Sequence, residues 1–256
     1  MYLAIPSQPD CLSAWREAVR LVDASPGHEA HNVLIDIVDP VARTGPFEPQ
    51  IAVIEGFLQK HEKSVQTVAN TIFPESLYIR HGNPKFFEVF EKQVLARVRK
   101  NDRWSGYYFE RMMCLPAPGG EPSNQLKEII RRLRDPNIKA LNKFELSVFD
   151  PLRDVDDSPY GGQCLSHASF KVIKGTKTLT LSVLYRNHYY VEKLLGNLIG
   201  LGRLMAFVAK EAEMDVGSLT VLSTHAEIDQ PGKCSRGDIV KLLADFDQAA
   251  VALVPA

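Results

Sequence analysis

Residues 178–229 read TLTLSVLYRNHYYVEKLLGNLIGLGRLMAFVAKEAEMDVGSLTVLSTHAEID. The run at 178–191 is rich in Leu, Val, Thr and Tyr, which predicts a strand. Residues 193–214 are apolar on nearly every side, which predicts a helix that is buried on most of its faces. Residues 217–229 alternate again and predict a second strand. The stretch therefore predicts a strand, a buried helix and a strand in succession.

The rest of the chain interleaves further helices and strands. Apolar residues recur at helical spacing in several segments, namely 11–25, 64–74, 83–100, 123–136 and 235–249. Strands are expected at 31–40, 143–150 and 165–174, while 49–63 stays ambiguous. Because no Pro/Gly/Ser-rich linker separates these elements, we expect one α+β domain over residues 1–256.

Composition narrows the class of protein. The chain has 256 residues, of which 45% are hydrophobic and 24% charged, and its formal net charge is −1. This balance is typical of a soluble globular protein and gives no basis for bulk binding to nucleic acid or an anionic membrane. The N-terminal ten residues lack the features of a signal peptide, and residues 194–209 are too polar to span a membrane. Four well-separated cysteines fit free thiols, so we expect a cytoplasmic protein.

Cys164 is the first candidate for chemistry. It follows Gly161 and Gly162 and precedes the alternating run at 165–174. A nucleophilic thiol needs a lowered pKa and access to its substrate. His167 lies three positions further on, and residues i and i+3 of a strand point to opposite faces. Judged from this stretch alone, a small buried cysteine is favoured over a nucleophile.

Two other residues have both a functional and a structural interpretation. Arg186 closes an apolar strand, where it could bind a phosphate bidentately or form a surface salt bridge. Asn197 lies in the apolar helix, so its amide must find partners in the backbone or on a bound base. The glycines of 196–202 match no nucleotide-binding fingerprint and favour close helix packing. Three residues alternate on the last strand and could line a cleft, without the further ligands that a metal site needs: His225, Glu227 and Asp229.

The features around Cys164 resemble the thymidylate synthase family. That family has a cysteine entering a strand in the pattern P-C-H-x-x-x-Q-F. Here QCLSHASFKV (163–172) supplies Cys164 and, six positions later, Phe170. The resemblance extends over roughly residues 104–229.

The downstream spacing carries the resemblance further. In the family an arginine ends a strand, and an asparagine follows eleven positions later inside an apolar helix, which is the spacing of Arg186 and Asn197. The segment EMDVGSLTVLSTHAEID (213–229) then follows in register. Upstream, WSGYYFERM (104–112) and NQLKEIIRRLRDP (124–136) are similar to the family's G-x-x-Y-G segment and its D-Q…L-x-x-D-P helix.

The resemblance implies a role for each matched residue. Cys164 would add to C6 of a pyrimidine nucleotide, so that C5 can attack a one-carbon unit carried by 5,10-methylenetetrahydrofolate. Arg186 would bind the 5′-phosphate and raise the thiolate character of Cys164. Asn197 would hydrogen-bond the base. The family's mobile catalytic tyrosine corresponds to Tyr107 or Tyr108, and we take Tyr108.

Several positions of the family's site carry other residues here. Leu165 replaces the histidine after the nucleophile, and Ser169 stands where the family has a glutamine near the phosphate. Asn187 replaces a phosphate-binding serine. Tyr189 takes the place of the aspartate that holds folate and substrate, which makes it the candidate cofactor contact.

Further departures affect the sugar, the phosphate and the proton transfers. Glu227 and Asp229 stand at the sugar-binding positions. Lys139 is the nearest counterpart of the arginines that reach across the family's dimer to the phosphate. Asn70 stands near the position of the glutamate in the pattern H-E-L-x-W-F, where an amide cannot act as a base. These changes point to a noncanonical substrate.

The expected function is methylation or hydroxymethylation of C5 of a pyrimidine nucleotide. The resemblance implies a thymidylate synthase-like fold, a large mixed sheet with flanking helices, and a homodimer formed through a sheet face. One alternative is a catalytically altered family member that binds a nucleotide or acts as a scaffold. Another is an unrelated cysteine enzyme that pairs Cys164 with His167 or His225. No membrane and no direct nucleic-acid contact are expected.

Overall fold

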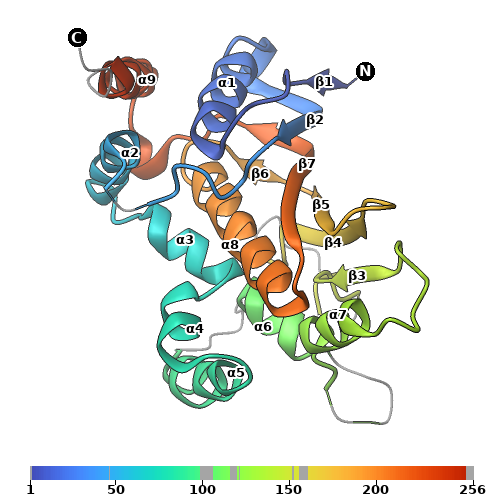
Figure 1. Ribbon diagram of the computed structural model, residues 1–256. Helices are drawn as coiled ribbons and strands as arrows, with labels where there is room; N and C mark the ends of the chain where they lie inside the picture. The colour runs from blue at the N-terminus through green and yellow to red at the C-terminus, as the bar shows by residue number, and fades with distance from the viewer. Residues whose placement is uncertain are drawn as a thin grey trace.

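The structure is a computed structural model, and it describes residues 2–45, 47–98, 106–115, 120, 122–151, 153–155 and 161–251. In this part of the chain one seven-stranded mixed sheet is flanked by helices (Figure 1). The sheet order is β1, β2, β7, β5, β4, β3, and β6 pairs with β7. The strands are β1 (Leu3–Ala4), β2 (Glu29–Ile37), β3 (Phe144–Ser147), β4 (Leu165–Val172), β5 (Thr178–Tyr185), β6 (His188–Tyr189) and β7 (Asp215–Glu227).

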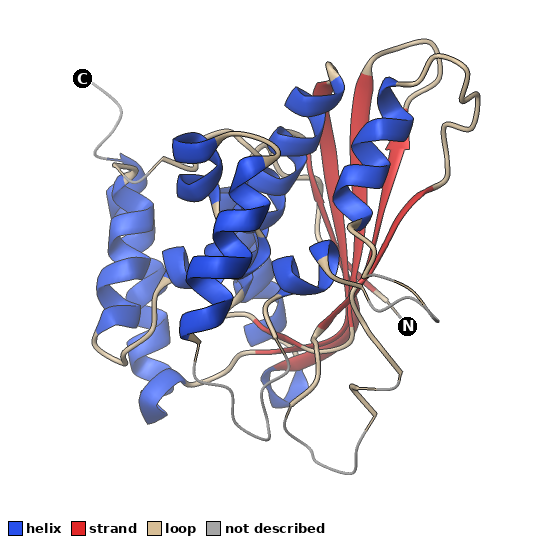
Figure 2. Cartoon of the chain, turned by 90° about the horizontal axis from the view of Figure 1, so that it is seen from below, coloured by secondary structure: helices blue, strands red, loops and turns tan. Residues whose placement is uncertain are grey.

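Most helices gather on one side of the strands (Figure 2). They are α1 (Cys11–Asp23), α2 (Pro49–Gln59), α3 (Val65–Ile72), α4 (Glu75–His81), α5 (Lys85–Val89), α6 (Tyr108–Met113), α7 (Gln125–Arg134), α8 (Leu194–Ala212) and α9 (Arg236–Val251). Strand β5 buries Leu179, Leu181, Val183 and Tyr185, whereas the residues between them are partly or largely exposed. The sheet therefore has one apolar covered face and one open face.

The predicted strand, buried helix and strand are present as β5, α8 and β7. Strands β5 and β7 pair in parallel, with Val183 opposite Val221, and α8 crosses between them. Helix α8 is buried on nearly all sides because small residues let its neighbours approach. A Cβ at Gly202 would come within 2.2 Å of the Pro40 carbonyl oxygen, and one at Gly196 within 2.6 Å of Val68 Cβ.

Several expected elements differ in detail. The ambiguous segment 49–63 contains helix α2. The helix expected over 83–100 is interrupted, because α5 passes into a π turn (Phe90–Val94) and a 3-10 turn (Leu95–Arg97). The strand expected over 178–191 is two strands, since β5 ends at Tyr185 and β6 pairs separately with the end of β7. No helix in the described ranges is long and apolar enough to cross a membrane.

A buried ion pair anchors the helix that carries the two candidate tyrosines. Arg111 of α6 donates from Nη2 to Asp154 Oδ1 (2.7 Å) and from Nη1 to Oδ2 (3.2 Å). Both side chains are almost completely inaccessible to solvent. Asp154 Oδ2 also accepts the backbone N–H of Asp150 at 2.8 Å. This pair fixes α6 to Asp154, whose carbonyl oxygen lies next to Gly162, so it positions both sides of the site described below.

Replacing Arg111 with Met should destabilise the protein by about 3–5 kcal/mol, because Asp154 would keep a buried charge without its cation. The free energy of unfolding in urea is the measurement. The exposed pair of Lys241 and Asp245 provides the control, and Lys241→Met should cost about 0–1 kcal/mol. Adding Asp154→Leu to Arg111→Met should recover part of the loss. Equal losses in the two single variants would contradict this account.

Candidate active site

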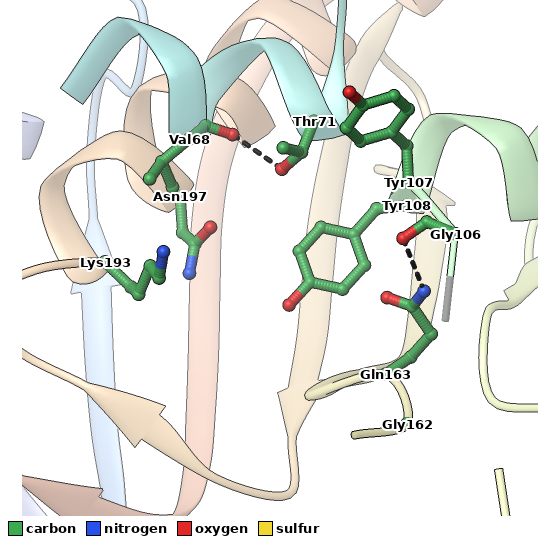
Figure 3. Close-up of a pocket in the computed structure, with 9 residues that line it drawn as sticks. All are labelled: Val68, Thr71, Gly106, Tyr107, Tyr108, Gly162, Gln163, Lys193 and Asn197. Carbon is green, nitrogen blue, oxygen red and sulfur yellow. Dashed lines mark hydrogen bonds between the residues drawn. The ribbon is translucent and has the colours of Figure 1, made fainter. Parts of the chain in front are cut away.

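A cavity of about 270 Å³ lies between α3, the start of α6, the loop before β4 and the N-terminal end of α8 (Figure 3). Thr71 comes from α3, Tyr108 from α6 and Gln163 from the loop. Lys193, the residue just before α8, and Asn197 of its first turn are four residues apart and therefore lie on one side of that helix. The cavity is thus lined by an apolar helix, a loop and the positively charged Lys193.

Cys164 follows the lining residue Gln163 and directly precedes β4. The hydroxyl of Tyr108 interacts with the backbone N–H groups of Cys164 and Leu165, and its ring lies 6.4 Å from that of Tyr185. In Figure 3 the Tyr108 ring extends from α6 across the middle of the cavity. Cys164 therefore lies next to the cavity, with its backbone N–H at the hydroxyl of Tyr108.

Two cations and burial change the pKa of the Cys164 thiol in opposite directions. Burial raises the pKa of Cys164, while the charges of Arg186 and then Lys193 lower it. Since burial is the largest of these effects, the pKa stays above that of a free thiol. Cys164 is therefore mainly protonated at neutral pH.

Arg186 holds the loop that presents the cysteine. Its Nε donates to the Gln163 carbonyl at 3.0 Å and its Nη2 to the Gly161 carbonyl at 2.6 Å. Its backbone N–H donates to the Cys164 carbonyl at 2.8 Å. Gly162 has a φ of +67°, and a Cβ there would lie 3.4 Å from Arg186 Nη2. Arg186 is exposed, so an anion could reach its guanidinium beside the loop.

Asn197 belongs to a buried polar network. Its Nδ2 lies 2.9 Å from Nε2 of His188, and Nδ1 of His188 lies 3.0 Å from Oγ of Ser223. The Tyr190 hydroxyl donates to the same Ser223 oxygen at 3.3 Å. Burial lowers the pKa of His188 to about 3, so its imidazole is neutral at physiological pH.

Two buried polar atoms at the site lack a hydrogen-bond partner among the described residues. They are Asn197 Oδ1 and Tyr185 Oη. The Tyr185 ring stacks on His188 with 4.1 Å between ring centroids. The pKa of the Tyr185 hydroxyl is raised by burial and by the neighbouring Tyr108 and Cys164. Unpaired buried polar atoms are costly, so a ligand that hydrogen-bonds them would gain affinity.

The structure thus brings Cys164, Tyr108, Arg186 and Asn197 together, and their chemical roles stay predictions. Asn187 lies close to them in the chain, but its Oδ1 is 2.6 Å from Nδ1 of His225.

Asp229 and Glu227 lie at the end of β7, away from the lining of the cavity. Asp229 accepts the backbone N–H groups of Val191 (2.8 Å) and Glu192 (3.2 Å). Burial and then the Glu192 charge raise its pKa, to about 6, against the N–H donors that lower it. Asp229 therefore fixes the segment that leads into α8. In the strand register, the backbone of Glu227 lies opposite that of Glu29 in β2 and that of Tyr189 in β6.

Three other candidates are held by contacts elsewhere. Ser169 donates to Glu145 Oε1 at 3.0 Å on the open sheet face. Lys139 donates to the Pro136 carbonyl at 2.8 Å in the turn after α7. Tyr189 follows the buried His188 in β6, so its side chain leaves the opposite face of the strand.

The histidines of the alternative cysteine-enzyme hypothesis have other partners. His167 Nε2 lies 2.9 Å from Glu145 Oε2. His225 lies between Asn187 and Glu29, with its Nε2 3.3 Å from Glu29 Oε2. These contacts do not favour a pairing of either ring with the Cys164 thiol.

Asn70 lines a second cavity, of about 340 Å³, that shares Thr71 and Tyr107 with the first. Its apolar wall includes Phe90 and Val94. The two cavities therefore lie on either side of the same pair of residues, and Asn70 belongs to the second one.

Sequence reasoning missed Lys193, Gln163 and His188. Lys193 could have been found because it precedes Asn197 by one helical turn. Gln163 contributes through its side chain, whose Nε2 donates to the Gly106 carbonyl at 2.9 Å. Nothing local marks His188, since its partner Ser223 is on another strand.

The chain resembles two curated proteins, while no protein-family model matches it. A protein of Methanothermobacter marburgensis named "Putative thymidylate synthase" is 25% identical over 213 residues, which cover 83% of this chain and 82% of that protein. A protein of the same name from Methanothermobacter thermautotrophicus is 28% identical over 156 residues, which cover 60% of this chain and 64% of its own length.

Replacing two neighbours of Cys164, Lys193 and Tyr108, should change its rate of alkylation in opposite directions. Lys193→Met removes a cation that favours the thiolate, so iodoacetamide should label Cys164 several-fold more slowly at pH 8. Tyr108→Ala removes the ring that covers Cys164, so labelling should be faster. The labelled peptide is quantified by mass spectrometry, with the exposed Lys241→Met as control. Unchanged rates in both variants would contradict the geometry.

Proposed function

We propose that this chain, a divergent member of the thymidylate synthase family, transfers a one-carbon unit to C5 of a pyrimidine nucleotide after Cys164 adds to C6. One observation carries the proposal: Asn197 lines the same cavity as Gln163, and a buried oxygen of Asn197 lacks a partner among the described residues. Cys164 directly follows Gln163, and Arg186 donates to the Gln163 carbonyl, so the thiol and the cation lie beside that cavity. The reaction needs a thiol nucleophile, a cation for a phosphate and an amide for the edge of a base.

The order of events follows from the positions of these side chains. The ring of Tyr108 first moves off Cys164, and the thiolate forms a bond from Sγ to C6. The electron pair of the C5–C6 double bond moves toward C5 and O4. The Asn197 amide and the Lys193 ammonium, on one face of α8, lie where they can stabilise that charge. C5 would then bond to the one-carbon unit and give up its proton to water. The bond between that carbon and the carrier nitrogen would break as the carrier leaves, and water (for hydroxymethylation) or a hydride from the reduced carrier (for methylation) would add to the carbon. Sγ would finally leave C6 as the double bond returns.

The absence of a carboxylate at Asn70 shapes this proposal. An amide does not accept the C5 proton, so water in the cavity takes that role. Hydroxyl groups of Thr71 and Tyr107 lie between the two cavities and could order such water. We therefore expect turnover to be slow.

The second cavity suits the carrier of the one-carbon unit. Its volume of about 340 Å³ is in the range of small-molecule sites, and it combines an apolar wall with polar groups. Asn70, Thr71 and Tyr107 would hydrogen-bond the carrier, and Phe90 would pack against it. Methylenetetrahydrofolate supplies, when bound, a carbon at the oxidation level of formaldehyde.

A second candidate function is nucleotide binding without turnover. Two observations favour it: the raised pKa of the covered Cys164, and the amide of Asn70 at the second cavity. In that case Arg186 and Asn197 would still bind a nucleotide, while Cys164 would form no bond to it.

Covalent trapping separates the two candidates. Protein mixed with 5-fluorodeoxyuridine monophosphate and methylenetetrahydrofolate should gain the combined mass of the nucleotide and the folate, because fluorine at C5 cannot leave as a proton does and the reaction stops with both attached. The Cys164→Ala variant should gain nothing. Cys114→Ala, at a half-buried cysteine outside the cavity lining, should react like the parent protein.

Calorimetric measurement of nucleotide binding is needed to interpret the trapping result. Nucleotide binding without an adduct would replace the proposed transfer by the second candidate function. Neither binding nor an adduct, with uracil and cytosine nucleotides of both sugars, would reject both.

We further propose that the open sheet face binds a second copy of the chain. This face carries half-exposed polar residues in adjacent strands, including Thr180, Thr220 and the Ser169–Glu145 pair. Light scattering at micromolar concentration should give twice the chain mass of 28.6 kDa. Arg replacement of Thr220 should weaken the dimer, whereas Arg at the exposed Val240 of α9 should not. A monomeric parent protein would contradict this proposal.

A further inference from the structure

His188 is the buried group whose contacts the proposed reaction leaves unexplained. It is 2% exposed and lies between three elements: its ring stacks on Tyr185 of β5, its Nδ1 faces Ser223 of β7, and its Nε2 faces Asn197 of α8. Each ring nitrogen therefore has one defined partner, and no charged side chain is among these contacts.

The donor and acceptor roles within this set are linked. The Asn197 nitrogen Nδ2 can only donate, so the His188 nitrogen Nε2, 2.9 Å away, must carry a lone pair. A neutral imidazole then has its proton on Nδ1, which donates to Ser223 Oγ at 3.0 Å. The opposite amide orientation would place Asn197 Oδ1 against that lone pair. With this tautomer, His188 therefore holds the amide in one orientation.

The orientation determines what Asn197 offers a ligand. Its Oδ1 is an acceptor without a partner among the described residues, in a side chain that is 3% exposed and lines the cavity. The second hydrogen of Nδ2 stays available to a ligand. A complementary ligand edge presents an N–H next to a carbonyl oxygen, as N3–H and O4 of uracil do. Cytosine presents a lone pair at N3 and an amino group at C4, the reverse pattern.

We infer that His188 is a positioning residue that fixes the Asn197 amide and thereby makes the site selective for a uracil-type base over a cytosine-type base. The inference rests on the proposed function, because it takes a pyrimidine nucleotide as the ligand. His188 acts through Asn197 and does not itself contact the base. A cytosine would leave Asn197 Oδ1 facing a lone pair, and buried mismatched polar groups are rejected strongly.

The test compares two affinities in each of three proteins. Calorimetry should show the parent protein binding deoxyuridine monophosphate on the order of 100-fold or more tightly than deoxycytidine monophosphate. His188→Phe keeps a ring beside Tyr185 but lets the amide turn, so this ratio should fall at least about tenfold. His167→Phe, on the open sheet face, should leave the ratio unchanged. If His188 had only a structural role, the His188→Phe variant would bind both nucleotides more weakly by the same factor.

A second measurement avoids any variant that fails to fold. The ¹⁵N chemical shifts of the His188 ring in the parent protein report which nitrogen carries the proton, and we expect Nδ1. A proton on Nε2 would reverse the amide and overturn the inference.

The binding data separate this inference from the proposed function. Equal affinity for the two nucleotides, or an unchanged ratio in His188→Phe, would overturn the inference and leave the proposed function standing. A parent protein that binds neither nucleotide would overturn both.

Discussion

The close packing of α8 between the sheet and α3 is the constraint on which the site depends. Gly196 and Gly202 let Val68 and the backbone of Pro40 approach the helix to distances that a side chain would forbid. This approach buries Asn197 and forces its amide to find a buried partner, which is His188. It also places Lys193, whose ammonium pairs with Glu192 at 2.6 Å, at the edge of the cavity. The close packing of α8 therefore determines which polar groups lie at the site.

The loop before β4 supplies the opposite side. Arg186 donates to two of its carbonyl groups, Gln163 donates to Gly106, and the buried Arg111–Asp154 pair fixes α6 nearby. Cys164 is consequently held in place but covered, with a raised pKa that disfavours the thiolate in the free protein. Such a thiol is suited to react only after a ligand has displaced Tyr108. In the proposed reaction, activation of Cys164 would therefore follow substrate binding.

Much of this arrangement follows from sequence patterns, and the remainder depends on contacts between distant segments. Hydrophobic periodicity predicted β5, α8 and β7, and spacing linked Cys164, Arg186 and Asn197, which the structure brings together. Periodicity could not show that Asp229 caps the approach to α8, because its backbone partners lie almost forty positions away. The His188–Ser223 contact likewise joins β6 to β7. The interruption of the helix expected over 83–100 also has no local signal in the sequence.

A crystal structure with deoxyuridine monophosphate would test the central claim most directly, since the account places one ligand against three named groups. We predict the base in the cavity with its C6 within about 3.5 Å of Cys164 Sγ. Its N3 should face Asn197 Oδ1, its phosphate should contact Arg186, and Tyr108 should have moved. A nucleotide bound elsewhere, or with its C6 turned away from a still-covered Cys164, would contradict the account.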